Sequence, residues 1–179
     1  MTEETIKNIK EWIIYAIIVV AASMFIVTFI AQRTIVDGNS MNNTLQNGDN
    51  LVVDKVSYRF SDPDRFDIVV FRYHNEKNTF YIKRIIGLPG ETIQIVDDDI
   101  YVDGKLLEED YGKDPMLEAG RATEPVTLGN DEYFVLGDNR NDSADSRDPS
   151  VGNIQEDWIV GRALFRITPL KKMGLLLEK

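Results

Sequence analysis

The stretch TFYIKRIIGLPGETIQIVDDDIYVDG (79–104) decides the fold class of this chain. Its three apolar runs are rich in Ile, Val, Phe and Tyr, which suit half-buried pleated surfaces. LPGE lies between the first two runs, and VDGK follows the third; both are turn sequences. Asp103-Gly104, between IYV and KLL, is a two-residue hairpin signal. The stretch therefore predicts antiparallel strands joined by short turns.

The same pattern continues on both sides of this stretch. Four more runs of strand-forming residues are NLVVDKV (50–56), DIVVFRY (67–73), EYFVLG (132–137) and WIVGRALFRI (158–167). No long 3.6-residue period follows residue 33, so we expect residues 34–179 to be mainly antiparallel β. The polar stretch from 107 to 125 is interpreted as a long loop or excursion. For the tail 169–179, a short helix and a strand end remain open.

Length and composition limit the possible functions. The chain has 179 residues, of which 43% are hydrophobic, enough for one compact domain and an anchor. Its net charge of −10 argues against binding to nucleic acid. The absence of cysteine excludes disulfides, thiolate metal sites and cysteine nucleophiles. His74 is the only histidine, so a Ser-His-Asp triad would have to use it.

An apolar segment without Asp, Glu, Lys or Arg extends over residues 12–32. Its length matches the ~20 residues that a helix needs to cross a bilayer. Trp12 and Tyr15 lie at one end, where aromatic rings favour the membrane interface. The rivals are a cleaved signal peptide, whose apolar region is usually ~7–15 residues, and a buried globular helix. We predict a short N-terminus (1–11), a transmembrane helix (12–32) and a catalytic β domain (33–179).

The distribution of basic residues predicts the orientation of this anchor. Lys7 and Lys10 precede the span, whereas only Arg33 follows it closely. Because basic residues accumulate on the cytoplasmic side, we expect a cytoplasmic N-terminus and an extracytoplasmic β domain. The predicted location is the plasma membrane, crossed once.

Ser40 is a candidate nucleophile in the segment directly after the anchor. It lies in VDGNSMNNTLQNGD (36–49), two residues after Gly38, which permits a tight turn. The alternative is an ordinary loop serine. At most roughly 26 Å of chain separates Ser40 from Gln32, so a nucleophile here would meet substrates that emerge from the bilayer.

A serine nucleophile requires a base, and two residues are candidates. His74 lies in the polar connection YHNEKN, where an exposed position is expected. Lys83 lies within the apolar run YIKRII beside Arg84, and alternation along a strand would send one of these cations inward and the other outward. Burial could supply a neutral amine from lysine, whereas arginine stays charged. An edge strand with two solvated cations is the alternative.

The segment GDNRNDSADSRDPSVGN (137–153) is densely polar. Asp138, Asp142 and Asp145 lack the alternate-residue spacing of a helix-loop-helix calcium site, and a plain solvated loop remains an alternative. Arg140 and Arg147 stand among the acids, and such a mixture can form a network that fixes a neighbouring site.

Four segments, in this order after one apolar span, resemble the boxes of type I signal peptidases, in particular the single-span form of Gram-positive bacteria. They are GNSM (38–41), NGDNLVV (47–53), YIKRIIGLPGE (81–91) and GDNRNDSADSR (137–147). The resemblance extends from the anchor through Arg166. It implies a β-sheet ectodomain and a membrane-bound serine endopeptidase that removes signal peptides from exported preproteins after small residues at −1 and −3.

The resemblance also implies a role for individual residues. Ser40 matches the nucleophile, Lys83 the general base, and Ser143 the serine that hydrogen-bonds the lysine amine. Residues expected to hold the site together are Arg84, Asp138, Asp145 and Arg147. Residues expected to line the substrate pockets are Val36, Gly38, Met41, Leu45, Tyr81 and Ile82.

The oxyanion hole departs from part of the family. Some members carry a serine hydroxyl donor where this chain has Gly38, so the backbone N–H of Ser40 is the expected donor. The loss of one such donor can cost ~2.7–4 kcal/mol.

The partners implied are signal peptides and the lipid bilayer, with no metal, cofactor or nucleic acid. One alternative is a self-cleaving Ser/Lys protease of the LexA-like repressor kind, which would carry a DNA-binding module where this chain has its anchor. Another is a non-catalytic, membrane-tethered β domain that binds exported chains.

Overall fold

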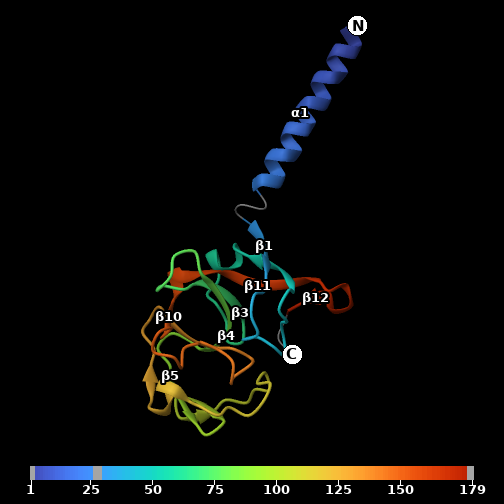
Figure 1. The fold of residues 1–179 in the computed structure, drawn as a ribbon. Coiled ribbons are helices and arrows are strands. Elements are labelled where there is room, and N and C mark those ends of the chain that lie inside the picture. Colours follow the sequence, from blue (N-terminus) through green and yellow to red (C-terminus); the bar gives the residue numbers. More distant parts are fainter. Residues whose placement is uncertain (1–2, 26–29, 177–179) are drawn as a thin grey trace.

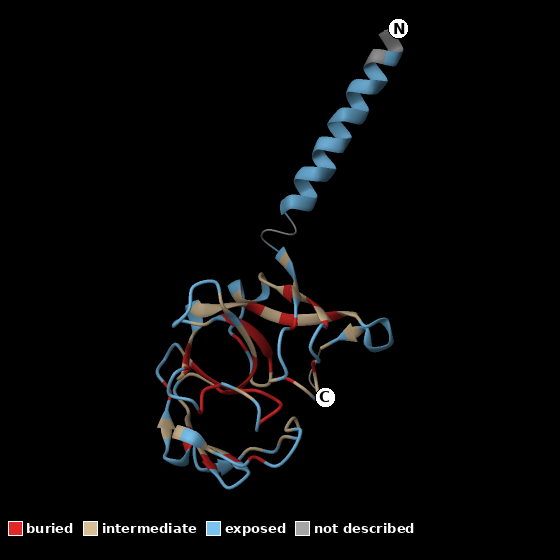
Figure 2. Cartoon of the chain, in the orientation of Figure 1, coloured by how far each residue is buried: buried red, intermediate tan, exposed pale blue. Residues whose placement is uncertain are grey.

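The computed structural model describes residues 3–25 and 30–176. The helix α1 (Glu3–Phe25) stands away from a domain built of strands and loops (Figure 1). The part Lys7–Phe25 is long and apolar enough to cross a membrane, and none of it is buried against the rest of the protein. Figure 2 shows this helix exposed along its described length. Apolar side chains such as Ile17, 62% exposed, therefore lack a protein core, and lipid is the solvent that suits them.

The observed helix and the predicted span differ at both ends. The helix begins at Glu3, upstream of the predicted start at Trp12. At the other end, Ala31 and Gln32 belong to strand β1 (Ala31–Ile35), because their backbone pairs with Asp54 and Val53. The predicted residues 26–29 lie outside the described part of the chain.

The larger sheet is antiparallel in all its pairings and contains eight strands. The path of neighbouring strands is β1-β2-β11-β3-β4-β9-β10, and β12 pairs with β11. After β1, these strands are β2 (Asn50–Asp54), β3 (Ile68–Arg72), β4 (Phe80–Gly87), β9 (Glu132–Leu136), β10 (Ile154–Gln155), β11 (Ile159–Thr168) and β12 (Gly174–Leu175). The mainly β prediction is confirmed.

The smaller sheet has four antiparallel strands in the order β7-β6-β5-β8. They are β5 (Thr92–Val96), β6 (Asp99–Val102), β7 (Lys105–Leu106) and β8 (Val126–Thr127). Val102 pairs with Lys105, and the intervening Asp103 and Gly104 have φ of 51° and 74°. A two-residue turn with both φ positive matches the twist of the flanking strands, so the predicted hairpin is confirmed.

In the described part of the chain, β1 and β4 of the larger sheet each have a backbone edge without a strand partner. Strand β1 ends the strand path, so one of its sides has no strand partner. Strand β4 pairs with β3 from Phe80 to Arg84, but β9 pairs with it only from Arg84 onward. The half Phe80–Lys83 is therefore open on the β9 side, and a strand could add there.

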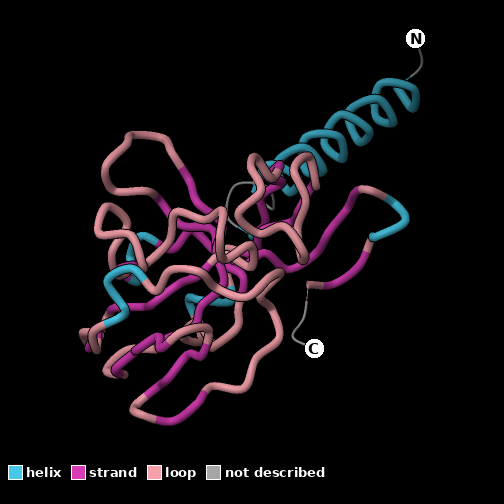
Figure 3. Tube along the Cα trace, turned by 60° about the horizontal axis from the view of Figure 1, so that its bottom comes forward, coloured by secondary structure: helices cyan, strands magenta, loops and turns pink. Residues whose placement is uncertain are grey.

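Short 3₁₀ turns and long loops connect the strands (Figure 3). The 3₁₀ turns are η2 (Ser57–Arg59), η3 (Gly120–Thr123), η4 (Glu156–Trp158) and η5 (Leu170–Lys172). The 107–125 segment is the predicted excursion and contains only η3, yet it buries Met116 and Ala122. The tail forms η5 and then β12, at the protruding hairpin near the C-terminus.

Candidate active site

Ser40 lies in a loop that is fastened to the domain from several sides. Two backbone hydrogen bonds close the loop base: the Val36 N–H donates to the Asp49 carbonyl, and the Gly48 N–H donates to the Val36 carbonyl, each at 2.9 Å. The Gly38 N–H donates to Asn47 Oδ1 at 3.1 Å, and Gly38 has φ +106°, a conformation that favours glycine. These contacts fix the entry of the chain into Ser40.

Lys83 approaches this loop from β4. Its Nζ lies 2.7 Å from Ser40 Oγ and 3.1 Å from the Ile82 carbonyl oxygen, and the residue is 4% exposed. Burial lowers the pKa of Lys83 from 10.5 to about 8, although the carboxylates of Asp145 and Asp138 act in the opposite direction. Desolvation disfavours the ammonium form, so a substantial neutral fraction exists near neutral pH. A neutral amine at this distance can accept the proton of the serine hydroxyl.

The expectation that one of the adjacent cations faces solvent is wrong. Arg84 is 3% exposed, because its face of β4 is also covered. Its Nε and Nη2 donate to the two carboxylate oxygens of Asp138 at 2.8 and 2.7 Å. Such a bidentate pair compensates the burial of both charges and fixes their relative orientation.

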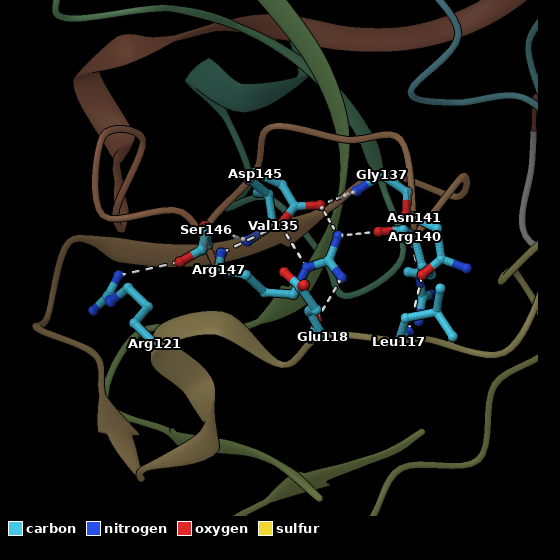
Figure 4. A network of polar contacts seen from close by, with 10 residues as sticks. All are labelled: Leu117, Glu118, Arg121, Val135, Gly137, Arg140, Asn141, Asp145, Ser146 and Arg147. Carbon is cyan, nitrogen blue, oxygen red and sulfur yellow. Dashed lines mark hydrogen bonds and ion pairs between the residues drawn. The ribbon is translucent and has the colours of Figure 1, made fainter. Parts of the chain in front are cut away.

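Asp145 and Arg147, both in the 137–147 loop, form a second buried ion pair (Figure 4). Arg147 donates from Nε and Nη2 to the two Asp145 oxygens at 2.9 Å each. Asp145 Oδ2 also accepts the Gly137 N–H at 3.0 Å. Asp138 and Asp145 thus have arginine partners, which does not fit the calcium-loop alternative for this segment.

The 137–147 loop directly contacts the Ser40 loop. The Asn139 N–H donates to the Ser40 carbonyl oxygen at 2.9 Å, and Asn139 Nδ2 donates to the Asn39 carbonyl at 3.1 Å. A Cβ at Gly137 would overlap both Ser143 Oγ and the Ser40 carbonyl oxygen. Only glycine permits this close approach of the two loops. Neither the role of Asn139 nor that of Gly137 was predicted, although both lie in the GDNR segment.

The predicted contact between Ser143 and the lysine amine is not present. Ser143 Oγ is buried and forms no hydrogen bond with the part of the chain that the structure describes. The Lys83 amine instead points to Ser40 Oγ and the Ile82 carbonyl. Ser143 lies beside Gly137, at the junction of the two loops.

A cleft of about 430 Å³ opens at the Ser40–Lys83 pair. Of the predicted pocket residues, four line it: Val36, Gly38, Tyr81 and Ile82. Met41 and Leu45 do not line it, which corrects their expected position. Both are almost fully buried in a core cluster with Leu51, because the turn after Ser40 directs them under the sheet. The cleft lies along the open edges of β1 and β4.

His74 belongs to a different surface. It is exposed, as expected for a loop position, and its ring stacks on Trp158 with centroids 4.9 Å apart. It lines a separate pocket with Asn78 and Phe80. The described hydrogen bond to the Ser40 hydroxyl comes from Lys83.

Comparison with known proteins decides the family. The sequence model described as "Signal peptidase, peptidase S26" matches residues 9–168. The chain belongs to the signal peptidase family.

Relatives from Bacillus licheniformis and Synechocystis agree with this family assignment. A signal peptidase I of Bacillus licheniformis is 36% identical over 184 residues, covering 97% of this chain and 98% of that protein. A probable signal peptidase I-2 of Synechocystis is 41% identical over 158 residues, covering 84% of this chain and 69% of that protein. The crystal structure of a signal peptidase I from Enterococcus faecalis is 34% identical, with a TM-score of 0.49, and covers 57% of this chain and 97% of that one.

The function that follows is that of a type I signal peptidase, a serine peptidase of the hydrolase class. This family is membrane-associated, and the apolar helix α1 is consistent with an anchor.

Proposed function

We propose that Ser40 is the nucleophile and Lys83 the general base with which this signal peptidase removes signal peptides from exported preproteins. The observation that carries the assignment is the 2.7 Å contact between Lys83 Nζ and Ser40 Oγ, with the amine buried and the pKa of Lys83 lowered to about 8. A serine hydroxyl is a weak nucleophile until a base takes its proton, and this arrangement supplies that base.

The reaction proceeds through an acyl-enzyme. Neutral Lys83 takes the Ser40 proton while Ser40 Oγ bonds to the carbonyl carbon of the −1 residue. The resulting ammonium returns the proton to the leaving amine as the C–N bond breaks. Water then attacks the ester, with Lys83 again as base, and releases the signal peptide. Because serine and lysine supply both functions, the reaction requires no metal and no cofactor.

The substrate binds as an added strand. The open edges of β1 and of Phe80–Lys83 flank the cleft, and an extended peptide can form backbone hydrogen bonds with such edges. Val36, Tyr81 and Ile82 line this cleft, and in this proposal their side chains limit the substrate to small residues at −1 and −3. Met41 and Leu45 then shape the floor from below rather than touch the substrate.

The Ser40 N–H is the oxyanion donor in this proposal. The Gly38 N–H is directed to Asn47 Oδ1 and is therefore occupied. Arg84, Asp138, Asp145 and Arg147 hold the two loops in place, and Ser143 fills their junction. A backbone donor held in place in this way, here the Ser40 N–H, stabilises the negative charge that develops on the substrate oxygen in the transition state.

The chain crosses the plasma membrane once, with residues 1–11 cytoplasmic and the catalytic domain outside. Lys7 and Lys10 before the apolar stretch favour this orientation over Arg33 behind it. A tag at each terminus, with protease added to intact cells, tests it. A protected C-terminal tag would reverse the orientation.

The direct test of the activity uses the full chain in detergent with a preprotein that has alanine at −1 and −3. Wild type should release the mature protein, and Ser40→Ala should not while keeping the same circular dichroism spectrum. His74→Ala is the matched control and should cleave at the wild-type rate. Cleavage by Ser40→Ala at the wild-type rate would remove Ser40 from its role. Excess EDTA should leave the rate unchanged.

A non-catalytic binding domain is the alternative of another class. It would bind preproteins without releasing product and would not be acylated by a serine-directed β-lactam. The buried amine beside Ser40 favours the enzyme, because a mere binding surface gains nothing from this costly burial of a lysine.

A further inference from the structure

The excursion 107–125 leaves the small sheet after β7 and contacts the 137–147 loop. The Lys113 N–H donates to the Asp138 carbonyl at 2.8 Å, and Arg147 Nη1 donates to the Glu118 carbonyl at 3.0 Å. Glu109 forms an ion pair with Arg140 at 2.8 Å. The excursion therefore contacts the 137–147 loop at several points and is more than a solvated connection.

Tyr111 makes the contact that reaches deepest. Its ring covers the guanidinium of Arg84, with the guanidinium carbon 3.7 Å from the ring centroid. A cation over an aromatic face at this distance is attracted, and the attraction grows when water is excluded, as it is at Arg84, which is 3% exposed. The planar guanidinium thus has one face fixed by an aromatic ring.

Phe66, just before β3, contacts both Tyr111 and the guanidinium of Arg84. Its ring lies 5.1 Å from that of Tyr111, and its carbonyl oxygen accepts Arg84 Nη1 at 2.9 Å. Phe66 has φ +72°, which is unusual for a bulky residue and costs conformational energy. Its N–H donates to the Ile85 carbonyl, so the strained backbone is held in the orientation that aims its carbonyl at Arg84. Such strain persists where surrounding contacts over-determine it.

Arg84 connects this aromatic pair to both sides of the nucleophile. Its carboxylate partner Asp138 precedes Asn139, whose N–H holds the Ser40 carbonyl. Its Nη2 also donates to Thr44 Oγ1 at 3.3 Å, in the turn that follows Ser40. A shift of the guanidinium would therefore move the Ser40 loop relative to Lys83, the neighbour of Arg84 in β4.

We propose that Tyr111 and Phe66 form an aromatic clamp whose role is to position Ser40 against Lys83 through Arg84. The excursion 107–125 then contributes a positioning residue, Tyr111, to the active site. Neither clamp residue touches the substrate cleft, so both are positioning residues. The inference rests on the proposed Ser40–Lys83 pair.

The test measures kcat and KM separately for Tyr111→Phe and Tyr111→Leu in the full chain. Phenylalanine keeps the ring over Arg84 and should retain kcat within ~2-fold. Leucine keeps apolar bulk but loses the ring, and should lower kcat ~10- to 100-fold, the scale expected for a small misplacement of reacting groups. KM should change less than ~3-fold, since the cleft is intact.

Tyr101→Leu is the control, because it removes a tyrosine of β6 (Asp99–Val102), outside the clamp. It should leave kcat unchanged. Phe66→Leu keeps the backbone carbonyl and loses the ring contact, so it should lower kcat in the same direction and carries the test if Tyr111→Leu does not fold. Wild-type kcat in folded Tyr111→Leu and Phe66→Leu would overturn the clamp. That result, beside an inactive Ser40→Ala, would leave the proposed function intact, whereas an active Ser40→Ala would remove the function itself.

Discussion

The pH dependence of cleavage is the sharpest test of lysine catalysis. Burial lowers the pKa of Lys83 from 10.5 to about 8, and only the neutral amine can act as the base. At pH 7 about a tenth of the enzyme then carries neutral Lys83, against ~0.03% for an unshifted lysine, a gain of about 300-fold in active enzyme. Between pH 6 and pH 8 the neutral fraction rises about 50-fold.

We therefore expect kcat/KM to rise about 50-fold between pH 6 and pH 8 and to level off above the pKa of Lys83. The assay is cleavage of a signal-peptide substrate by the full chain in detergent, with circular dichroism at each pH to confirm that the protein stays folded. Lys83→Arg keeps the charge but loses the base and should be at least ~1,000-fold less active throughout. A flat profile, or an inflection that disappears in His74→Ala, would refute lysine catalysis and revive the histidine triad.

Three further changes have definite expected outcomes. Lys83→Met should be inactive yet more stable than wild type in urea unfolding at pH 7. Because the folded-state pKa of Lys83 is lowered, wild-type stability rises between pH 8 and pH 10.5, so the difference in unfolding free energy between the two proteins should shrink by ~3 kcal/mol over that window. A difference that stays constant with pH would contradict the lowered pKa. Gly137→Ala should lower kcat at least ~10-fold, since the methyl group overlaps Ser40 and Ser143, whereas Gly174→Ala, with open space around it, should be neutral; equal rates would refute the close approach. Asp138→Asn should destabilise the domain by ~3–5 kcal/mol by leaving Arg84 buried without its partner charge, and a loss below ~1 kcal/mol in urea would show that the pair is dispensable.

Local sequence pattern was sufficient for the long strands and the hairpin. Runs rich in Val, Ile, Phe and Tyr located β2 to β6, β9 and β11, and Asp103-Gly104 located the turn. The short strands β8 and β10 were missed, because two residues carry no pattern. Strand β7 is the expected second arm of the hairpin, and a strand end is one of the two alternatives open for the tail that contains β12. Strand β1 was missed, because its first residues continue an apolar run and become a strand only by pairing with β2.

The site required knowledge of contacts that sequence pattern does not encode. Alternation suggested an inward lysine, but it also sent Arg84 to solvent, since nothing local reveals that residues 137–140 and 111 cover the other face. Met41 and Leu45 were placed in the cleft by the family resemblance, whereas the turn after Ser40 directs them into the core. The pairing of Ser40 with Lys83 was expected from the family resemblance, and their proximity depends on folding across residues far apart in the chain.

The pairing of β1 with β2 limits the distance between the start of the β domain and the nucleophile. The Lys55 N–H donates to the Ile30 carbonyl at the start of the domain, and the ten residues from Ile30 to Ser40 span at most ~36 Å. In the proposed membrane topology, the paired strand β1 therefore limits how far the nucleophile can lie from residue 30. Lengthening the spacer between a signal peptide's hydrophobic segment and its cleavage site should therefore abolish processing of the correct bond, even when the residues around that bond are ideal.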